Sequence, residues 1–281
     1  MEEIISLENV DYSYYGKIPA LRKVNLSVQR GEMFSVIGLN GSGKSTLLNI
    51  INALVFPDSG EVRYMGFPLT EKSLKEGTGP DIRRNMGYIF QNPDIQLFCP
   101  SVLDELLFGP LQMSLSPEEA RERAEQTLSF LGIEYLKDRS VNMLSGGEKK
   151  KVAIASVLTM NPDVLLVDEP LSSLDPKTQS FIIGLLVELN HAGKTIIFTT
   201  HNLELVEHLQ PRVAVISEEH TVTKTGTAAE ILQDHDFLVS VNLVHEHFHR
   251  HGSEEHSHYH SHYFFHRHLN NAGEGSGAIS G

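Results

Sequence analysis

The sequence has little of three things: cysteine, positive charge and long apolar runs. Its single cysteine, Cys99, cannot form an internal disulfide, which favours a reducing compartment. The 23 Lys and Arg residues against 36 Asp and Glu give a formal net charge of −13, which argues against nucleic acid as a partner. The best apolar stretch, residues 152–167, is interrupted by Asn161, Pro162 and Asp163, and no run approaches the roughly 18–20 residues that span a bilayer. The first residues are acidic where a signal peptide is basic, so we expect a soluble, cytoplasmic protein.

Apolar residues are nevertheless plentiful, and their distribution predicts one main domain and a tail. The chain of 281 residues is 40% hydrophobic and 21% charged, which is enough apolar material for a sizeable core. Ten of the fifteen histidines fall between His245 and His268, and residues 270–281 are too polar and small to pack. We therefore predict a folded domain over residues 1–240 and a histidine-rich, flexible tail over residues 241–281.

The apolar patterns within the main domain predict an α/β fold. Strand patterns over residues 4–36 end in a short apolar run, a glycine-rich loop and a helical stretch at 45–54, which is the opening of a parallel α/β sheet. Short apolar runs rich in β-branched residues predict buried parallel strands at 164–167 and 195–199. The remaining patterns predict a strand at 61–65, a surface loop at 71–80, a helix at 116–130 and another after Ser145.

The glycine-rich loop carries a complete phosphate-binding pattern. Residues 38–45 read Gly-Leu-Asn-Gly-Ser-Gly-Lys-Ser and fit G-x-x-x-x-G-K-[ST] between a strand and a helix. The glycines let backbone N–H groups surround phosphate oxygens, and the helix N-terminus adds its positive dipole end. Lys44 is expected to reach the β- and γ-phosphates, and the Ser45 hydroxyl to bind Mg²⁺. The residues expected to hold the nucleotide here are Gly38, Asn40, Gly41, Ser42, Gly43, Lys44, Ser45 and Thr46.

A second element supports the hydrolysis of a nucleoside triphosphate. The apolar strand at 164–167 is followed by Asp168 and Glu169, which places two carboxylates at the C-terminal edge of the sheet. There, Asp168 can hold Mg²⁺ through water, and Glu169 can orient or deprotonate the attacking water. An apolar strand ending in acids is a weak signal alone, but it gains weight beside the glycine loop.

Between these two elements the sequence resembles the ATP-binding cassette family, because residues 144–148 read Leu-Ser-Gly-Gly-Glu. The resemblance covers roughly residues 2–236 and implies a P-loop NTPase core with a mostly parallel sheet. It also implies an N-terminal antiparallel β subdomain and an inserted helical subdomain at about 92–160. By this resemblance Tyr14 stacks on adenine, Gln91 senses Mg²⁺ and the membrane partner, and His201 contacts the γ-phosphate. The implied cofactors are ATP and Mg²⁺; the implied Mg²⁺ ligands are Ser45, Gln91 and Asp168, and the implied catalytic residues are Glu169, His201, Lys44 and Gln91.

The resemblance also implies that the sites are completed by a second subunit. In the family, Ser145, Gly146 and Gly147 bind the ATP held by the partner, and residues 173–175 cross to it. We expect a head-to-tail homodimer, with a heterodimer with a related ATPase as the alternative. Glu148 and Leu171 stand where the family more often has glutamine and threonine, but neither position carries chemistry there. The basic run at 149–151 is interpreted as a solvated helix face rather than a nucleic-acid patch.

Residues 91–98 and 108–111 narrow the resemblance to the energy-coupling-factor branch. Members of this branch are prokaryotic importers that use a transmembrane coupling protein and a small substrate-binding membrane protein. The segment after Gln91 is where such an ATPase grips the coupling protein. The resemblance therefore implies a peripheral protein at the cytoplasmic face of the cell membrane.

The histidines of the tail favour a metal as cargo. They alternate with other residues, and neutral imidazole is a good ligand for Ni, Co, Cu and Zn. The candidate ligands are His245, His247, His249, His251, His256, His258, His260 and His262. Together with the branch resemblance, they favour nickel or cobalt uptake. The alternatives are a vitamin importer of the same branch, another metal importer such as one for zinc, and a solvated tail without a metal role.

Overall fold

The computed structural model describes the backbone of residues 2–77, 81–251 and 254–261, and the side chains of these residues up to Val244. Six strands form the central sheet: β3 (Met33–Ile37), β6 (Met86–Ile89), β7 (Val164–Asp168), β8 (Thr195–Thr200), β9 (Arg212–Ile216) and β10 (Val222–Thr227). Their order is β10-β9-β3-β8-β7-β6, and only β10 runs antiparallel to its neighbour. Both β7 and β8 are buried along their whole length, which their apolar, β-branched composition predicts for inner parallel strands.

A second, antiparallel sheet covers the first part of the chain. It consists of β1 (Glu3–Tyr14), β2 (Ile18–Gln29), β4 (Ser59–Tyr64) and β5 (Phe67–Pro68), in the order β2-β1-β4-β5. Helix α1 (Lys44–Ile51) lies between the two sheets, and its Leu48 packs in one cluster with Val10 of β1 and Phe34 of β3. The α/β fold with an antiparallel β subdomain, predicted from the sequence, is confirmed.

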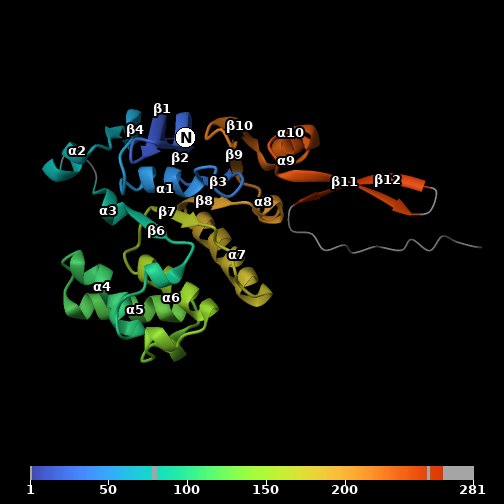
Figure 1. The fold of residues 1–281 in the computed structure, drawn as a ribbon. Coiled ribbons are helices and arrows are strands. Elements are labelled where there is room, and N and C mark those ends of the chain that lie inside the picture. The colour runs from blue at the N-terminus through green and yellow to red at the C-terminus, as the bar shows by residue number, and fades with distance from the viewer. Residues whose placement is uncertain (1, 78–80, 252–253, 262–281) are drawn as a thin grey trace, which may run out of the picture.

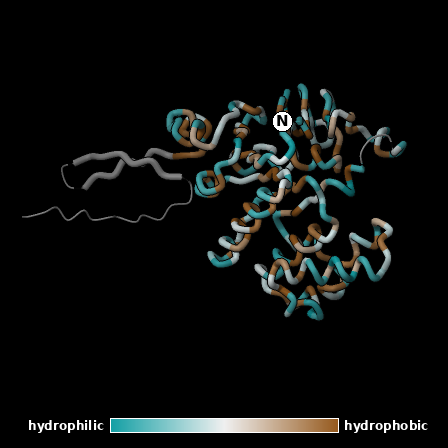
Figure 2. Tube along the Cα trace, turned by 180° about the vertical axis from the view of Figure 1, so that it is seen from behind, coloured by the Kyte–Doolittle hydropathy of each residue, from teal (hydrophilic) through white to brown (hydrophobic). Residues whose placement is uncertain are grey.

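A helical lobe is inserted between β6 and β7 and lies below the sheets in the view of Figure 1. Its apolar side chains form a cluster that extends to β7 and β8, and the hydropathy colouring alternates along its helices (Figure 2). The helix predicted at 116–130 spans Pro117–Phe130; its N-cap is Ser116, whose side chain forms a capping box with that of Glu119. The elements of the lobe are η1 (Pro93–Ile95), α4 (Val102–Gln112), α5 (Pro117–Phe130), η2 (Glu134–Leu136), η3 (Val141–Met143) and α6 (Gly146–Leu158), while α3 (Ile82–Asn85) directly precedes β6.

The prediction of a surface loop at 71–80 is wrong for its first part, because residues 71–76 form helix α2 (Glu71–Glu76). The Thr70 side chain caps this helix, and Lys75 forms an ion pair with Glu71 one turn earlier, at 2.6 Å. The helix buries no residue, so it has no apolar stripe by which a sequence pattern would reveal it. Residues 78–80 lie outside the described part of the chain.

The C-terminal part adds helices around the central sheet, and the described residues end in a two-stranded sheet. These elements are α7 (Pro176–His191), α8 (Leu203–Leu209), α9 (Ala228–Leu232), α10 (His235–Ser240), β11 (Val244–His251) and β12 (Glu254–Ser261). In the antiparallel register of β11 and β12, three histidine positions face three others: His245 opposite His260, His247 opposite His258, and His249 opposite His256. His262 lies outside the described residues, and the domain boundary near residue 240 stays a prediction. In the described ranges no helix combines the length and apolar composition that crossing a membrane takes.

Candidate nucleotide site

The glycine-rich loop turns between β3 and α1 in a shape that side chains would obstruct. Gly43, the N-cap of α1, has φ +110°, and a Cβ there would lie 2.2 Å from the Ala20 carbonyl oxygen. A Cβ on Gly38 would lie 2.5 Å from the carbonyl oxygen of Ile216. Two strands that are far apart in the sequence thus press on the loop, and glycine is required at both positions.

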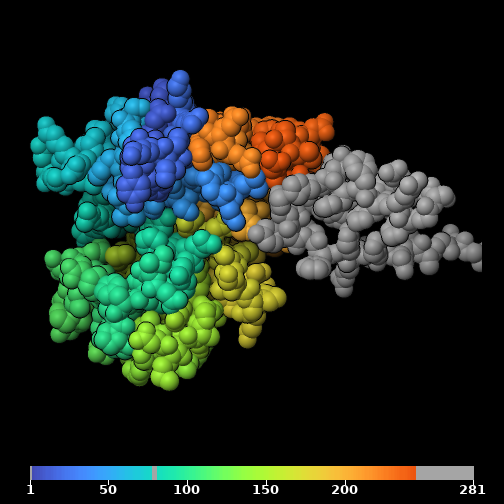
Figure 3. Space-filling view, viewed as in Figure 1, coloured from blue at the N-terminus to red at the C-terminus, as the bar shows by residue number. Residues whose placement is uncertain are grey.

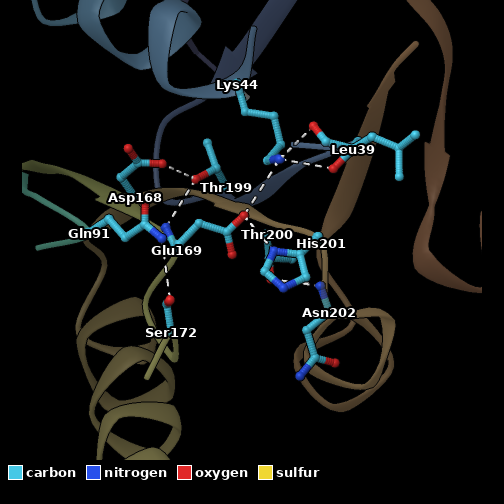
Figure 4. A network of polar contacts seen from close by, with 11 residues as sticks. Leu39, Lys44, Gln91, Asp168, Glu169, Ser172, Thr199, Thr200, His201 and Asn202 are labelled. Carbon is cyan, nitrogen blue, oxygen red and sulfur yellow. Dashed lines mark hydrogen bonds and ion pairs between the residues drawn. The ribbon is translucent and has the colours of Figure 1, made fainter. Parts of the chain in front are cut away.

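The side chain of Lys44 lies inside this loop, and its ammonium group is close to three oxygen atoms. Its Nζ donates to the carbonyl oxygens of Gly38 (2.9 Å) and Leu39 (3.1 Å) and lies 3.5 Å from Oε1 of Glu169 (Figure 4). The side chain is 6% exposed, and burial lowers its pKa, while Glu169 opposes that shift. Phosphate oxygens in the loop would therefore meet a cation that is already desolvated and held in place.

The two carboxylates predicted for hydrolysis lie at the end of β7, as the sequence placed them. Oε1 of Glu169 is 2.9 Å from Nδ1 of His201, which follows β8, so the structure joins Lys44, Glu169 and His201 in one polar network (Figure 4). Glu169 has φ +42°, a left-handed conformation that is costly for a side chain of this kind. The strained turn directs a carboxylate from a buried strand toward the glycine loop.

Thr199 of β8 organises this pair of carboxylates, although it is not among the site residues predicted from the sequence. Its fully buried hydroxyl donates to Oδ1 of Asp168 and accepts from the backbone N–H of Glu169, at 3.1 Å. One side chain thus orients Asp168 and holds the backbone of Glu169. A threonine in an apolar strand gives no signal of such a role, because threonine is enriched in strands generally.

We expect Thr199→Val to lower kcat for ATP hydrolysis about tenfold, which corresponds to about 1.4 kcal/mol. Valine keeps the volume but leaves a buried donor and acceptor unpaired. Thr195→Val is the matched control, since Thr195 is equally buried on the same strand and its hydroxyl accepts from Gly31 N–H, at 2.9 Å. Kinetics and thermal unfolding of both variants test this: an equal loss of kcat in both would mean that the effect is only one of stability.

A cavity of about 540 Å³ lies beside the loop and is large enough for a nucleotide. Tyr14, at the end of β1, lines it, and the Tyr14 hydroxyl is 3.0 Å from Oγ1 of Thr46. Gln91 also lines it, and its Nε2 donates to Oγ of Ser172, at 3.3 Å (Figure 4). His220, from the turn between β9 and β10, also lines it, although the sequence did not predict it as a site residue; its ring Nδ1 is 3.1 Å from the carbonyl oxygen of Ser42. The predicted site residues that line the cavity are Tyr14, Asn40, Gly41, Gly43, Lys44, Ser45, Thr46, Gln91 and Glu169.

The side chains and backbone present here fit ATP with Mg²⁺. The glycine loop is a cradle that a Cβ would fill, and among the described residues the buried Ser42 hydroxyl has no hydrogen-bond partner. The hydroxyl of Ser45 and the carboxylate of Asp168 are hard oxygen donors, which Mg²⁺ prefers together with phosphate oxygens. Both kinds of donor come from the ends of neighbouring elements at this edge of the sheet.

Ser145, Gly146 and Gly147 lie elsewhere, at the N-terminus of α6 in the helical lobe. The exposed Ser145 caps this helix, and Oε2 of Glu148 accepts from both its N–H and its hydroxyl, at 2.8 Å each. These hydrogen bonds lower the pKa of the Glu148 carboxyl. Glu148, the departure from the family pattern, therefore shapes the N-terminus that carries Ser145.

The prediction that the basic run at 149–151 is a solvated helix face is wrong for Lys150. Lys150 is 2% exposed, and its Nζ donates to the carbonyl oxygens of Phe90 (2.8 Å) and Gln91 (3.3 Å). Burial lowers the pKa of Lys150 to about 8, although the charges of Asp168 and Glu169 oppose this shift. The sequence does not reveal this burial, because Lys150 stands between two other lysines. Successive residues of a helix point in different directions, so one of the three can be buried while its neighbours are not.

Comparison with known proteins agrees with this geometry. Residues 21–172 match the family model described as ABC transporter. A putative ABC transporter ATP-binding protein of Methanosarcina acetivorans is 46% identical over 89% of this chain and 92% of its own length. The nickel import ATP-binding protein NikO of Rhodobacter capsulatus is 43% identical over 83% of this chain and 92% of its own length.

Solved structures show the same relationship. The structure of CbiO1 from Clostridium perfringens, described as part of the ABC transporter complex CbiONQ, matches with a TM-score of 0.73 and 37% identity. The match covers 86% of this chain and 96% of that chain. The chain thus belongs to the ABC transporter family and is an ATP-binding, ATP-hydrolysing subunit of an importer.

Proposed function

We propose that this protein powers the uptake of nickel or cobalt as the ATPase subunit of an energy-coupling-factor importer. The network of Lys44, Glu169 and His201 carries the hydrolytic part of this proposal. The cargo is supported chiefly by the nickel import relative, which is 43% identical to this chain over 83% of this chain and 92% of its own length. The CbiO1 structure, similar in fold and sequence, supports the type of importer.

In the proposed reaction, Glu169 accepts a proton from a water whose oxygen attacks the γ-phosphorus; the bond from that phosphorus to the β–γ bridging oxygen breaks, and ADP leaves. His201 holds the Glu169 carboxylate in place. Lys44 exchanges its contacts with the loop carbonyls and Glu169 for the β- and γ-phosphates, which frees Glu169 to act as the base. Tyr14 stacks on the adenine. Ser45, Asp168 and Gln91 would hold Mg²⁺, which neutralises charge on the transferred phosphoryl group.

Two chains work together in this proposal, because each contains one loop at 38–45 and one Ser145. Importer ATPases of this family act as dimers with transmembrane components. We infer a head-to-tail homodimer in which Ser145, Gly146 and Gly147 of one chain meet the ATP of the other. The same arrangement with a related second ATPase would give a heterodimer.

A groove of about 670 Å³ beside α4 suits the transmembrane coupling protein. It lies where the surface is hollowed between α3 and α4 (Figure 3). Phe98, Phe108 and Met160 contribute apolar walls. Phe98 is 65% exposed and packs edge-on against Phe108, with ring centroids 4.8 Å apart. Exposed aromatic side chains are costly in water and favour a partner surface. The groove would hold a coupling helix and place the ATPase at the cytoplasmic face of the membrane.

The tail is proposed to bind the same metal, as a buffer or a sensor. Residues directly opposite on antiparallel strands have Cβ atoms about 4.5–5.5 Å apart, which is within the reach of two imidazoles for one ion. The register of β11 and β12 puts histidines at both members of three such pairs, and alternate positions of a strand share one face. The tail therefore presents six histidine positions on one face.

Whole-cell nickel and cobalt content, measured in limiting metal, tests the proposal. We expect a selective fall in one metal when the intact transporter carries Glu169→Gln, and that metal is the cargo. A second strain carries glutamine at the six paired histidine positions and should keep ATP hydrolysis while the purified protein binds less Ni²⁺ or Co²⁺. Unchanged content of both metals with Glu169→Gln would overturn the metal cargo and favour a vitamin or zinc importer.

A further inference from the structure

Lys150 is a buried cation for which neither the hydrolytic network nor the cargo accounts. Among the described residues no carboxylate lies within 4 Å of its Nζ, and its hydrogen bonds go to two backbone carbonyl oxygens. Burying an ammonium group without a directly paired anion is costly, and an apolar side chain of the same length would avoid that cost. The hydrogen bonds of the Lys150 ammonium group thus hold the backbone at Phe90 and Gln91.

The backbone that Lys150 holds is the start of the loop that carries Gln91, and this loop is tied to α6 at two further points. The Gln96 side chain accepts from Phe90 N–H, at 3.2 Å, and donates to the carbonyl oxygen of Ala153, at 2.7 Å. At the surface, Lys149 forms an ion pair with Asp94, at 2.6 Å. Of these links, that of Lys150 is buried and charge-assisted, and it is the one that reaches Gln91 itself.

Ser145 is the N-cap of the same helix, α6, so Lys150 connects two groups that meet different ligands. Gln91 lines the nucleotide cavity of its own chain, whereas Ser145 lies in the helical lobe and is exposed. In the proposed head-to-tail dimer, on which this step rests, Ser145 meets the ATP of the other chain. If the ATP bound by one chain displaces Gln91 of that chain, α6 of the same chain would therefore move, and with it Ser145, which meets the ATP of the partner chain.

We propose that Lys150 is a positioning residue that couples the two ATP sites by joining the Gln91 loop to the N-terminus of α6. The coupling is mechanical: the ammonium group fixes the loop backbone to the helix, so that the two move as one body. Removing it should leave the binding of ATP to a single chain intact. It should weaken the effect of ATP at one site on hydrolysis at the other.

The test compares Lys150→Met with Lys149→Met in the full-length chain. Both remove one lysine from adjacent positions of α6, but Lys149 holds only the surface ion pair with Asp94. We expect Lys150→Met to lower kcat at least tenfold and to reduce the Hill coefficient for ATP toward 1. The dissociation constant for ATP, measured at protein concentrations that keep the chain monomeric, should change less than threefold. Lys149→Met should match the wild type in all three, and Lys150→Arg should restore part of the cooperativity.

Several results would overturn the proposal. One is a Hill coefficient and kcat unchanged in Lys150→Met; another is an equal loss in Lys149→Met. A loss of ATP affinity in the monomer as large as the loss of kcat would show that Lys150 only maintains the cavity. If Lys150→Met does not fold, Lys150→Gln, which keeps one donor, is judged by the same criteria. A Hill coefficient of 1 in the wild type would overturn the coupling, because it would show that the two ATP sites of the proposed dimer do not interact. It would not affect the proposal of a metal cargo.

Discussion

Glu169→Gln is expected to reduce kcat for ATP hydrolysis by about 10²- to 10⁴-fold, the range typical of losing a general base. The amide has the shape of the carboxylate and can still meet His201, which lies 2.9 Å from Oε1 in the wild type. It cannot take a proton from the attacking water. It also removes the negative charge 3.5 Å from Lys44, so ATP binding should be kept or strengthened.

Two measurements separate these effects. Single-turnover hydrolysis reports the chemical step, and light scattering with ATP and Mg²⁺ reports the dimer that unhydrolysed ATP should hold together. Glu204→Gln, a change on the exposed first turn of α8, serves as the control and should behave as the wild type. Hydrolysis within threefold of the wild type in Glu169→Gln would assign the base to another residue.

Gly43→Ala should abolish ATP binding at millimolar nucleotide and lower the free energy of unfolding by about 2–5 kcal/mol. Its Cβ would lie 2.2 Å from the Ala20 carbonyl oxygen and 3.1 Å from Cδ2 of Leu21, both on β2. The residue would also be held at φ +110°, which L-residues rarely adopt. The loop could relieve the contact only by moving away from β2, and that movement would displace Lys44.

Gly193→Ala separates backbone strain from the steric contact. Gly193, which follows α7, has φ +88°, but no atom lies within 4 Å of the Cβ position. We expect a loss of about 1 kcal/mol in stability there and unchanged ATP affinity. Equilibrium binding of a fluorescent ATP analogue and denaturant unfolding of both variants check the prediction. Equal ATP affinity in Gly43→Ala and the wild type would mean that the loop tolerates a side chain at its last turn.

The sequence by itself determined the parts of this protein that depend on local patterns. The glycine loop with Lys44, the apolar strand that ends at Asp168 and Glu169, and the capped helix after Ser116 are each contiguous, so their spacing specified their structure. Helix α2 was not predicted, because a helix without a buried face shows no helical spacing of apolar residues in its sequence. Tyr14 and Gln91, placed by family resemblance, do line the same cavity as the glycine loop.

Tertiary structure alone decided what depends on contacts between distant segments. Thr199 supports Asp168 across 31 positions of sequence, and His220 reaches Ser42 across 178. Lys150 is buried although its two neighbours in the sequence are lysines, since helix geometry turns it toward the Gln91 loop. Such pairs form only after strands and helices have packed, and a single sequence contains no local signal for a hydrogen bond between residues that folding brings together.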